Sequence, residues 1–328
     1  MNKMSNILVL MPPDVSASPA LHRAMAWARR SGATLHLNLF VHYEPIDYAG
    51  AVFGEEVADR ARRDFVGERM KRLSVLAAGL ADNGLRVECD VIWARNPARA
   101  IVACCSSLRP DLVVKDIAVT EDAAGHLHPG PLDWKLLRLL PAPLMLVRPA
   151  AKLDAQRILA AIDVSVPAAA ARLNERIFEA AELCASVPHA LLRIGSVFSG
   201  TPMVGYDTGF IAETWTLMDR AHEKALQQFA ETHGVKATNT LRSHRFDTAD
   251  GIARLAEDSC ADLVVLGSGY HGPLERLLFG TTADSVIRQL GTDLLLVKPA
   301  GFDVSSEELP KHAWQISAER QSAASLMS

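Results

Sequence analysis

The sequence predicts two tandem α/β domains, each built on a doubly wound, five-stranded, mostly parallel sheet. The segment 144–150 reappears 150 positions later as 294–300, so the chain carries two copies of one unit. This period is much longer than the roughly 20 to 50 residues of solenoid repeats, so each copy should have its own core. Within each copy, short apolar runs alternate with amphipathic stretches. That alternation is typical of parallel strands joined by right-handed helical crossovers.

In the first copy, five apolar runs are expected to be strands: 7–11, 35–41, 87–92, 112–114 and 144–147. Amphipathic stretches separate these runs, and their apolar residues recur at the spacing of a helix face. Two such faces are Leu21, Ala24, Met25 and Ala28, and Leu73, Leu76, Ala77 and Leu80. Helices are therefore expected between the strands.

The second copy repeats this order, with strands expected at 158–162, 191–197, 238–241, 263–266 and 294–297. Its last helix has a face formed by Ala283, Val286, Ile287 and Leu290. The expected domains are 1–151 and 155–302, joined by a short polar stretch. A polar tail, 303–328, follows them.

Composition indicates a soluble, cytoplasmic protein. The chain has 328 residues, of which 49% are hydrophobic and 22% charged, and its formal charge is −4. Basic and acidic residues are interspersed, so no nucleic-acid partner is expected. No apolar run reaches the length of a membrane span. The five cysteines form no CxxC pair, as expected for reduced thiols; Cys104 and Cys105 fall on an apolar helix face.

Candidate ligand residues follow the first and fourth strands of the second copy. In open parallel sheets, ligands bind beyond the carboxyl ends of the strands. Asp163 follows the first strand, and the Gly-bearing segment 267–272 follows the fourth, leading to Gly280, Thr281 and Thr282 at the start of the last helix. Glycines let backbone amides approach an anion, and a helix start offers unpaired N–H groups. This combination suits a phosphate.

With these motifs the chain resembles the universal stress proteins of the tandem kind, over residues 5–302. In nucleotide-binding members the fourth strand is followed by Gly, two residues, Gly, nine residues, then Gly and Ser or Thr. Gly267, Gly280 and Thr281 fit this pattern, whereas Tyr270 replaces its second glycine and Ser268 lies between. The resemblance implies Rossmann-like domains and ATP as the ligand. It assigns Asp163 to the adenosine part of ATP, and Thr281 and Thr282 to its phosphates.

Each of these residues also has a purely structural interpretation. Thr281, followed by Asp284, is an ordinary helix-start signature, and Asp163 before Ser165 and Pro167 could likewise only begin a helix. Gly267, Gly269 and Gly272 also spell the GxGxxG dinucleotide fingerprint. That motif belongs at the first strand-to-helix turn, so NAD is disfavoured. No Walker A sequence occurs, which gives rapid phosphoryl transfer little support.

The first copy differs at each corresponding point. Pro12 stands where the second copy has Asp163, Asp116 stands in place of Gly267, and Pro131 stands in place of Thr281. A negative charge and lost donors should abolish anion binding. We therefore expect no nucleotide site of the usual kind in the first copy.

Other segments have alternative interpretations. The loop 116–130 holds Glu121, Asp122, His126 and His128, a set that could ligate a divalent metal but has no identifying spacing. The segments 44–56 and 199–215 are apolar for connections. They could cap a hydrophobic cavity, although packing against the partner domain is the simpler explanation.

The expected partner of each copy is the other copy. The resemblance implies that 144–147 and 294–297 pair about a pseudo-twofold axis, and an exposed apolar edge strand invites such pairing. Whether two whole chains also form a homodimer is left open.

Two classes of function follow. The first is a stress-response protein that binds a nucleotide in the second copy and signals its occupancy to partner proteins. The alternative is a non-catalytic scaffold, or a binding module for a non-nucleotide ligand, apolar ligands included, in which the Gly-bearing loop is vestigial. No catalytic set is recognisable at the strand ends, so an enzyme ranks third, with slow ATP hydrolysis at most.

Overall fold

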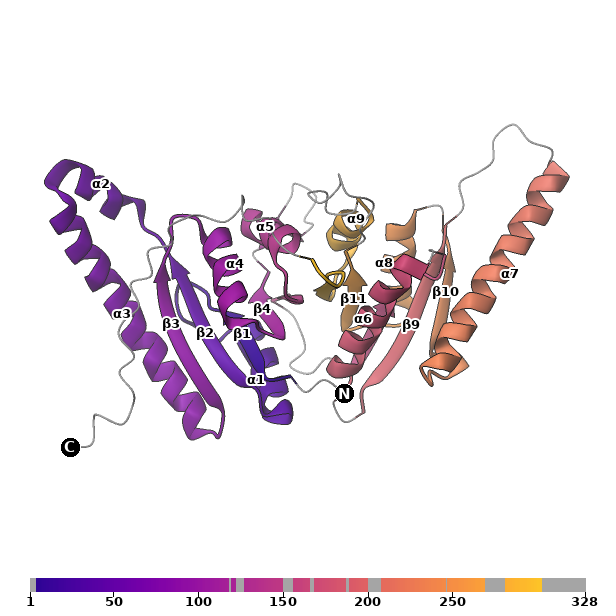
Figure 1. The fold of residues 1–328 in the computed structure, drawn as a ribbon, viewed down its shortest axis with the longest axis horizontal. Coiled ribbons are helices and arrows are strands. Elements are labelled where there is room, and N and C mark those ends of the chain that lie inside the picture. The colour runs from indigo at the N-terminus through magenta and orange to yellow at the C-terminus, as the bar shows by residue number, and fades with distance from the viewer. Residues whose placement is uncertain are drawn as a thin grey trace. The chain divides into compact units, whose positions relative to one another are not determined.

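The computed structural model describes residues 4–117, 119–121, 127–149, 156–165, 168–186, 189–199, 208–245, 247–268 and 281–302 (Figure 1). The described residues form two compact units. The first comprises 4–116 and 139–142, and the second comprises the described parts of 117–138 and 143–302. The hairpin, the last helix and the last strand of the first sequence copy thus group mainly with the second copy.

The first unit is built on four parallel strands in the order β4-β1-β2-β3. Every residue of β1 after Asn6 is buried, as expected for a strand covered on both faces. The strands are β1 (Asn6–Leu10), β2 (Thr34–Val41), β3 (Arg86–Trp93) and β4 (Leu112–Asp116). The helices are α1 (Pro19–Ser31), α2 (Glu44–Phe53), α3 (Glu55–Asp82) and α4 (Pro97–Leu108), of which α3 runs along β3 (Figure 1).

Local sequence explains where α1 begins and ends. The Ser18 hydroxyl accepts a hydrogen bond from the Leu21 N–H, and Pro19 occupies the first turn, where its missing N–H costs nothing. Gly32 closes the helix with a φ of 68°, a left-handed conformation that glycine adopts without strain. This helix is therefore fixed at both ends by its own sequence.

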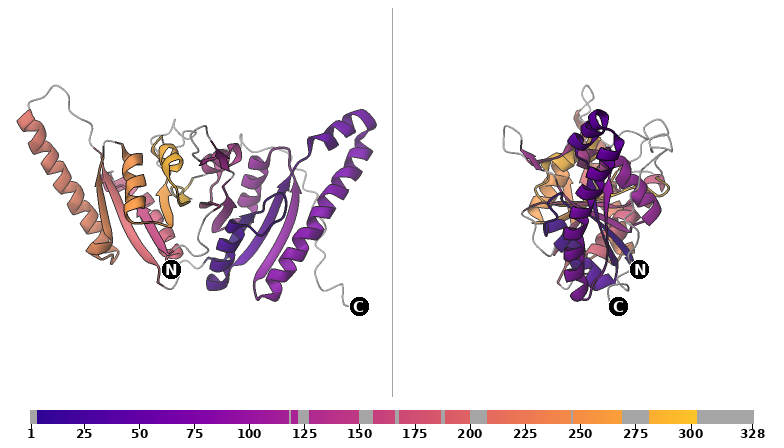
Figure 2. Two further views of the ribbon diagram at one scale, coloured as in Figure 1. Left: turned by 180° about the vertical axis from the view of Figure 1, so that it is seen from behind. Right: turned by 90° about the vertical axis from the view of Figure 1, so that its left-hand side faces the viewer.

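The main sheet of the second unit has six described strands in the order β10-β9-β8-β11-β12-β7, parallel except for β7. They are β7 (Leu144–Val147), β8 (Arg157–Ala161), β9 (Leu191–Phe198), β10 (Thr240–His244), β11 (Leu263–Gly267) and β12 (Asp293–Val297). The helices are α5 (Pro131–Leu139), α6 (Ala168–Cys184), α7 (Thr208–Thr232), α8 (Thr248–Asp258) and α9 (Thr281–Gln289). Seen from behind, α7 lies along β9 and β10 (Figure 2). A small hairpin joins β5 (Val119–Glu121) to β6 (Leu127–Pro129).

The last strands of the two copies pair antiparallel, as predicted. Leu294 pairs with Leu146, Leu295 with Met145, and Leu296 with Leu144. Met145 and Leu295 are equivalent positions of the repeat, so a local pseudo-twofold axis passes between them. The expected intrachain pair of the two copies is confirmed at these strands.

The predicted fold class and strands are confirmed, with most ends shifted by two residues or fewer. The largest shift is at 238–241, where a 3₁₀ turn (Ala237–Asn239) precedes β10 and the strand ends three residues later than predicted. The interpretation of 44–56 as a connection was wrong, because this segment forms α2 and the start of α3. Tyr48 and Phe53 are not buried there but are 72% and 70% exposed.

Among the described residues, no helix combines the length and apolar character needed to cross a membrane.

Candidate functional site

Asp163 lies directly beyond the carboxyl end of β8. The Ile162 N–H still donates to the Gly195 carbonyl on β9, at 2.9 Å, and the chain then turns away from the sheet. The Asp163 side chain is exposed, and its Oδ1 accepts from the Ser165 N–H at 2.9 Å. This hydrogen bond stabilises the turn after β8 and so keeps the Asp163 carboxylate at the end of the strand.

The side-chain amide of Asn174 on α6 forms hydrogen bonds with both the N–H and the carbonyl of Asp163. Its Oδ1 accepts from the Asp163 N–H at 3.1 Å, and its Nδ2 donates to the Asp163 carbonyl at 2.7 Å. Asn174 is buried, and it stands on the apolar helix face that continues with Ile177 and Ala181. A buried amide with both groups paired fixes one local geometry, so Asp163 is preorganised. Sequence reasoning missed Asn174, although a polar residue in an apolar stripe was a usable signal.

Gly267 ends β11, and its lack of a side chain is required by packing. A Cβ atom there would lie 2.7 Å from Leu173 Cδ2 and 2.9 Å from Ile177 Cδ1, both on α6. The next residue, Ser268, is buried, and its N–H donates to the Val297 carbonyl at 2.9 Å. The amide of Ser268 therefore continues the sheet and is not available to a ligand.

The structure brings Asp163 and the Gly267–Ser268 segment to one edge of the sheet. Strand β8 pairs with β11 in parallel, with Val265 opposite Ala160, so continued register sets Ser268 level with Asp163. In the sheet, β8 lies between β9, the next strand along the chain, and β11. This is the reversal of strand order at which open α/β sheets bind ligands.

Thr281 and Thr282 are the first two residues of α9. The first N–H groups of a helix have no partner within it and carry a partial positive charge, which suits an anion. Helix α9 is anchored by Ala283, Val286 and Ile287, all buried. Tyr270 and Gly280 lie outside the described residues, as do the side chains of Thr281 and Thr282.

A buried polar pair beside Asp163 was not predicted. Ser196 on β9 is 1% exposed and His222 on α7 is 5% exposed, and Ser196 Oγ lies 3.0 Å from His222 Nε2. Phe198 lies near the imidazole, with ring centroids 5.4 Å apart, and near Trp215 at 5.1 Å. Burial, together with the charge of Arg242, lowers the pKa of His222, so the ring is neutral at pH 7. A histidine in the stripe with Leu226 and Ala230 was the available signal.

In the first copy, carboxylates of the chain itself occupy the corresponding donors. Asp116 Oδ1 accepts from the Ala20 N–H in the first turn of α1 at 2.9 Å. Asp133, which is fully buried, accepts through Oδ2 from the Gly130 N–H at 3.1 Å, just before α5. Pro131 has no N–H to offer. The N–H groups of Ala20 and Gly130 thus already donate to carboxylates of the chain and are not available to an external anion.

A further ionic cluster lies at the carboxyl ends of β2 and β3. Asp47 of α2 accepts from His42 at 2.7 Å, Arg62 at 3.0 Å and Arg95 at 2.7 Å. Burial alone would raise the pKa of Asp47, but these hydrogen bonds lower it to about 2. The first copy therefore pairs Arg62 and Arg95 internally.

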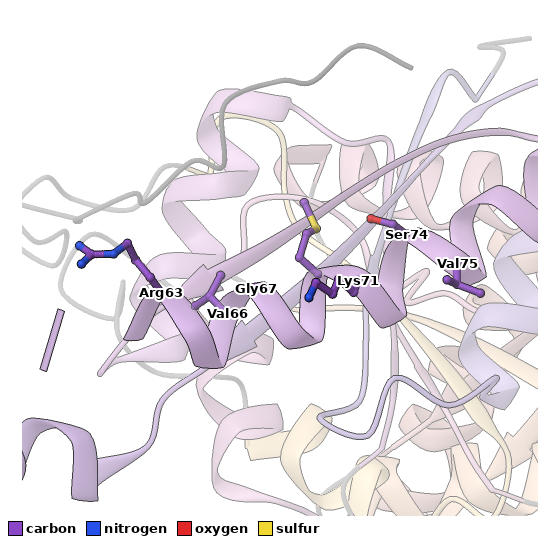
Figure 3. Close-up of a pocket in the computed structure, with 7 residues that line it drawn as sticks. Arg63, Val66, Gly67, Lys71, Ser74 and Val75 are labelled. Atoms are coloured by element: carbon purple, nitrogen blue, oxygen red, sulfur yellow. The ribbon is translucent and has the colours of Figure 1, made fainter. Parts of the chain in front are cut away.

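The metal alternative gains no support from the described residues. No group of three or more potential metal ligands occurs among them; His126 and the side chain of His128 lie outside them. A hollow along one face of α3 is lined by Arg63, Val66, Gly67, Met70, Lys71, Ser74 and Val75 (Figure 3). Because all seven belong to one helix, the hollow is an open groove. It contains none of the candidate nucleotide residues.

Comparison with known proteins gives consistent matches. The model of the universal stress protein family matches residues 4–148 and 155–298, once for each copy. Universal stress protein E of Escherichia coli K12 is 25% identical over 310 residues, covering 92% of this chain and 96% of its own. A universal stress protein E homolog of Haemophilus influenzae is 25% identical over 317 residues, with 92% and 99% covered.

Two solved structures match the chain along most of its length. A Pseudomonas aeruginosa PAO1 protein of unknown function is 25% identical, with a TM-score of 0.72 over 90% of this chain and 93% of that one. A universal stress protein from Archaeoglobus fulgidus is 15% identical, with a TM-score of 0.57 over 90% and 98% of the two chains. At that identity, the second match supports the fold alone.

Proposed function

Because the chain belongs to the universal stress protein family, we propose that its second copy binds a nucleotide, ATP or a similar phosphate ligand. The protein acts in the cytoplasm as a ligand-responsive regulator of the stress response. It has no dedicated catalytic activity beyond slow ATP hydrolysis at most. Partner proteins respond to the occupancy of the site.

The contrast between the two copies carries this proposal. In the first copy, Asp116 and Asp133 accept hydrogen bonds from the backbone N–H groups of Ala20 and Gly130. In the second copy, the residue that replaces Asp116 is the uncharged Gly267, and Thr281 begins α9 where the first copy has Pro131. An anion is attracted to unpaired donors and repelled by carboxylates, so a phosphate favours the second copy.

In this proposal, Asp163 and the start of α9 bind different parts of the nucleotide. The exposed Asp163 carboxylate, held in place by Asn174, accepts hydrogen bonds from the adenosine part. The helix start at Thr281 and Thr282 receives the phosphates, where N–H groups and the helix dipole stabilise negative charge. Gly267 lets α6 pack close to the strand end. Ser268, Tyr270 and Gly280 are the further residues assigned to the ligand.

Calorimetric titration with ATP tests this assignment. One ATP is expected to bind per chain, and Thr281→Ala or Gly280→Val should weaken binding at least tenfold, about 1.4 kcal/mol. The matched control is Pro131→Ala at the position equivalent to Thr281, which should leave the affinity unchanged. Equal losses from both copies, or two ATP per chain, would contradict a single site in the second copy.

The open groove on α3 supports a second candidate, a binding module for an apolar ligand. Its lining includes the apolar Val66, Met70 and Val75 and the basic Arg63 and Lys71. Figure 3 shows that these side chains come from one helix. Native mass spectrometry of the purified chain distinguishes the two candidates by the mass and number of copurified ligands. A nucleotide mass supports the first candidate, and an apolar ligand without any nucleotide supports the second.

A further inference from the structure

The Ser196–His222 pair lies beside the Asp163 turn. Strands β8 and β9 run parallel with Ala161 opposite Gly195, and the Ile162 N–H extends the ladder by one residue. Continued register sets Ile162 level with Ser196 and Asp163 level with Val197. The charge of Asp163 also acts on the His222 imidazole. The pair therefore belongs to the strand-end region that contains the candidate nucleotide residues.

One nitrogen of His222 lacks a partner within the described part of the chain. Nε2 is hydrogen bonded to Ser196 Oγ, whereas Nδ1 is buried with no hydrogen-bond partner there. Leaving a buried polar atom unpaired costs roughly 1–3 kcal/mol. Such a group calls for an explanation, and a ligand atom that bonds to it recovers part of this cost.

The pair is confined to the second copy. β2 and β9 have the same length, and Leu39 of β2 takes the place of Ser196. Leu39 is fully buried, and α3, which corresponds to α7, contains no histidine. The polar pair is thus present in the copy proposed to bind nucleotide and replaced by apolar packing in the other.

We propose that His222, oriented by Ser196, is a specificity-determining residue of the nucleotide site and bonds a ribose hydroxyl through Nδ1, next to Asp163. This inference rests on the proposed function and adds to it a residue that selects for the sugar. Phe198 and Trp215 lie at the same strand end and supply apolar surface beside the sugar.

The chemistry of the pair favours a hydroxyl. A neutral imidazole has one donor and one acceptor nitrogen, and the serine hydroxyl can either donate to Nε2 or accept from it. Nδ1 is accordingly an acceptor or a donor. A sugar hydroxyl satisfies either state, since it both donates and accepts. The Asp163 carboxylate, whose charge acts on the imidazole, accepts from a second hydroxyl, so the two groups suit the vicinal diol of ribose.

The test compares ATP with 2′,3′-dideoxy-ATP by calorimetry on the full chain. His222→Leu should weaken ATP binding about five- to tenfold, the effect of one lost hydrogen bond. The affinity for the dideoxy nucleotide should stay within about twofold, because that ligand has no hydroxyl to lose. The matched control is His233→Leu, directly after the end of the same helix, where Nε2 is already bonded to Glu175 at 2.7 Å. That variant should leave both affinities unchanged.

A second measurement needs no variant. The ¹⁵N resonance of His222 Nδ1 should shift when ATP is added and stay in place with the dideoxy nucleotide. Equal weakening of both nucleotides by His222→Leu, no weakening at all, or an unmoved Nδ1 resonance at saturating ATP would each overturn the inference and leave the proposed function intact. Failure of the unsubstituted chain to bind ATP would overturn the proposed function, and this inference with it.

Discussion

Met145 pairs with Leu295, its own counterpart in the repeat, at the centre of the antiparallel β7–β12 contact. Each strand is followed by a buried cation that reaches the last helix of the other copy. Arg148 donates from Nε to the Thr292 carbonyl at 3.0 Å and also to the Leu290 carbonyl. Lys298 donates to the Arg138 carbonyl at 3.3 Å. Both side chains donate to carbonyls that have no partner within the helix, so each copy completes the hydrogen bonding at the helix end of the other.

Lys298 should make stability depend on pH. Burial lowers the pKa of Lys298 from its ordinary 10.5 to about 7. The unfolded chain therefore binds more protons at this group between those values, and stability rises as the pH increases from about 7 towards 10.5. The slope reaches about 1.4 kcal/mol per pH unit at most. Urea unfolding at pH 7 to 9 should show this rise, Lys298→Met should remove it, and the exposed Lys135→Met should keep it. An unchanged slope in Lys298→Met would contradict the assignment.

Gly267→Ala should destabilise the second unit. The added Cβ would meet Leu173 and Ile177 at 2.7–2.9 Å, closer than carbon atoms pack. Relieving such overpacking costs about 1–3 kcal/mol. The control is Gly291→Ala, where a Cβ meets nothing within 4 Å. Thermal unfolding of the two variants measures the difference, and equal midpoints would show that α6 adjusts freely.

These residues show what the sequence could and could not predict. The strands followed from apolar periodicity, which is a property of the chain alone, whereas the β7–β12 pairing was implied by the resemblance to the family and fits two apolar edge strands. Helix α2 was missed because its outer face exposes Tyr48 and Phe53, so its apolar residues suggested a buried connection. Asn174 and His222 depend on partners contributed by other elements. Such partners appear only once α6 and α7 are placed on the sheet, so a polar residue in an apolar stripe could mark each position but not its role.

Asp116→Gly introduces the second copy's residue into the first copy. The Ala20 N–H in the first turn of α1 loses its acceptor, so stability should fall by about 1 kcal/mol, as at other helix N-termini. No second nucleotide site should arise, since Asp133 still holds the Gly130 N–H and Pro131 has none. Titration with ATP should therefore keep its one-to-one stoichiometry. A second ATP bound by this variant would mean that Asp116 alone had excluded it.

The Asp163–Asn174 pair allows a stricter exchange between the copies. Met11 and Ile162 make equivalent sheet bonds, to Asn38 and Gly195, so Pro12 corresponds to Asp163. Counting back from the matching ends of α1 and α6 aligns Leu21 with Asn174. In the first copy, Pro12 therefore has no backbone N–H to donate, and Leu21 has no side-chain amide to accept one. The two differences belong together, because a proline leaves no donor to satisfy.

Asn174→Leu alone should destabilise the chain by about 2 kcal/mol, since it strips partners from the N–H and the carbonyl of Asp163. Adding Asp163→Pro should recover part of that loss, because one unpaired donor disappears and proline restricts the unfolded chain. The double variant should bind ATP more weakly than the unsubstituted chain, since it lacks the Asp163 carboxylate. Unfolding and titration of both variants check this. If the double variant were less stable than Asn174→Leu, the two positions would not be coupled through the backbone N–H.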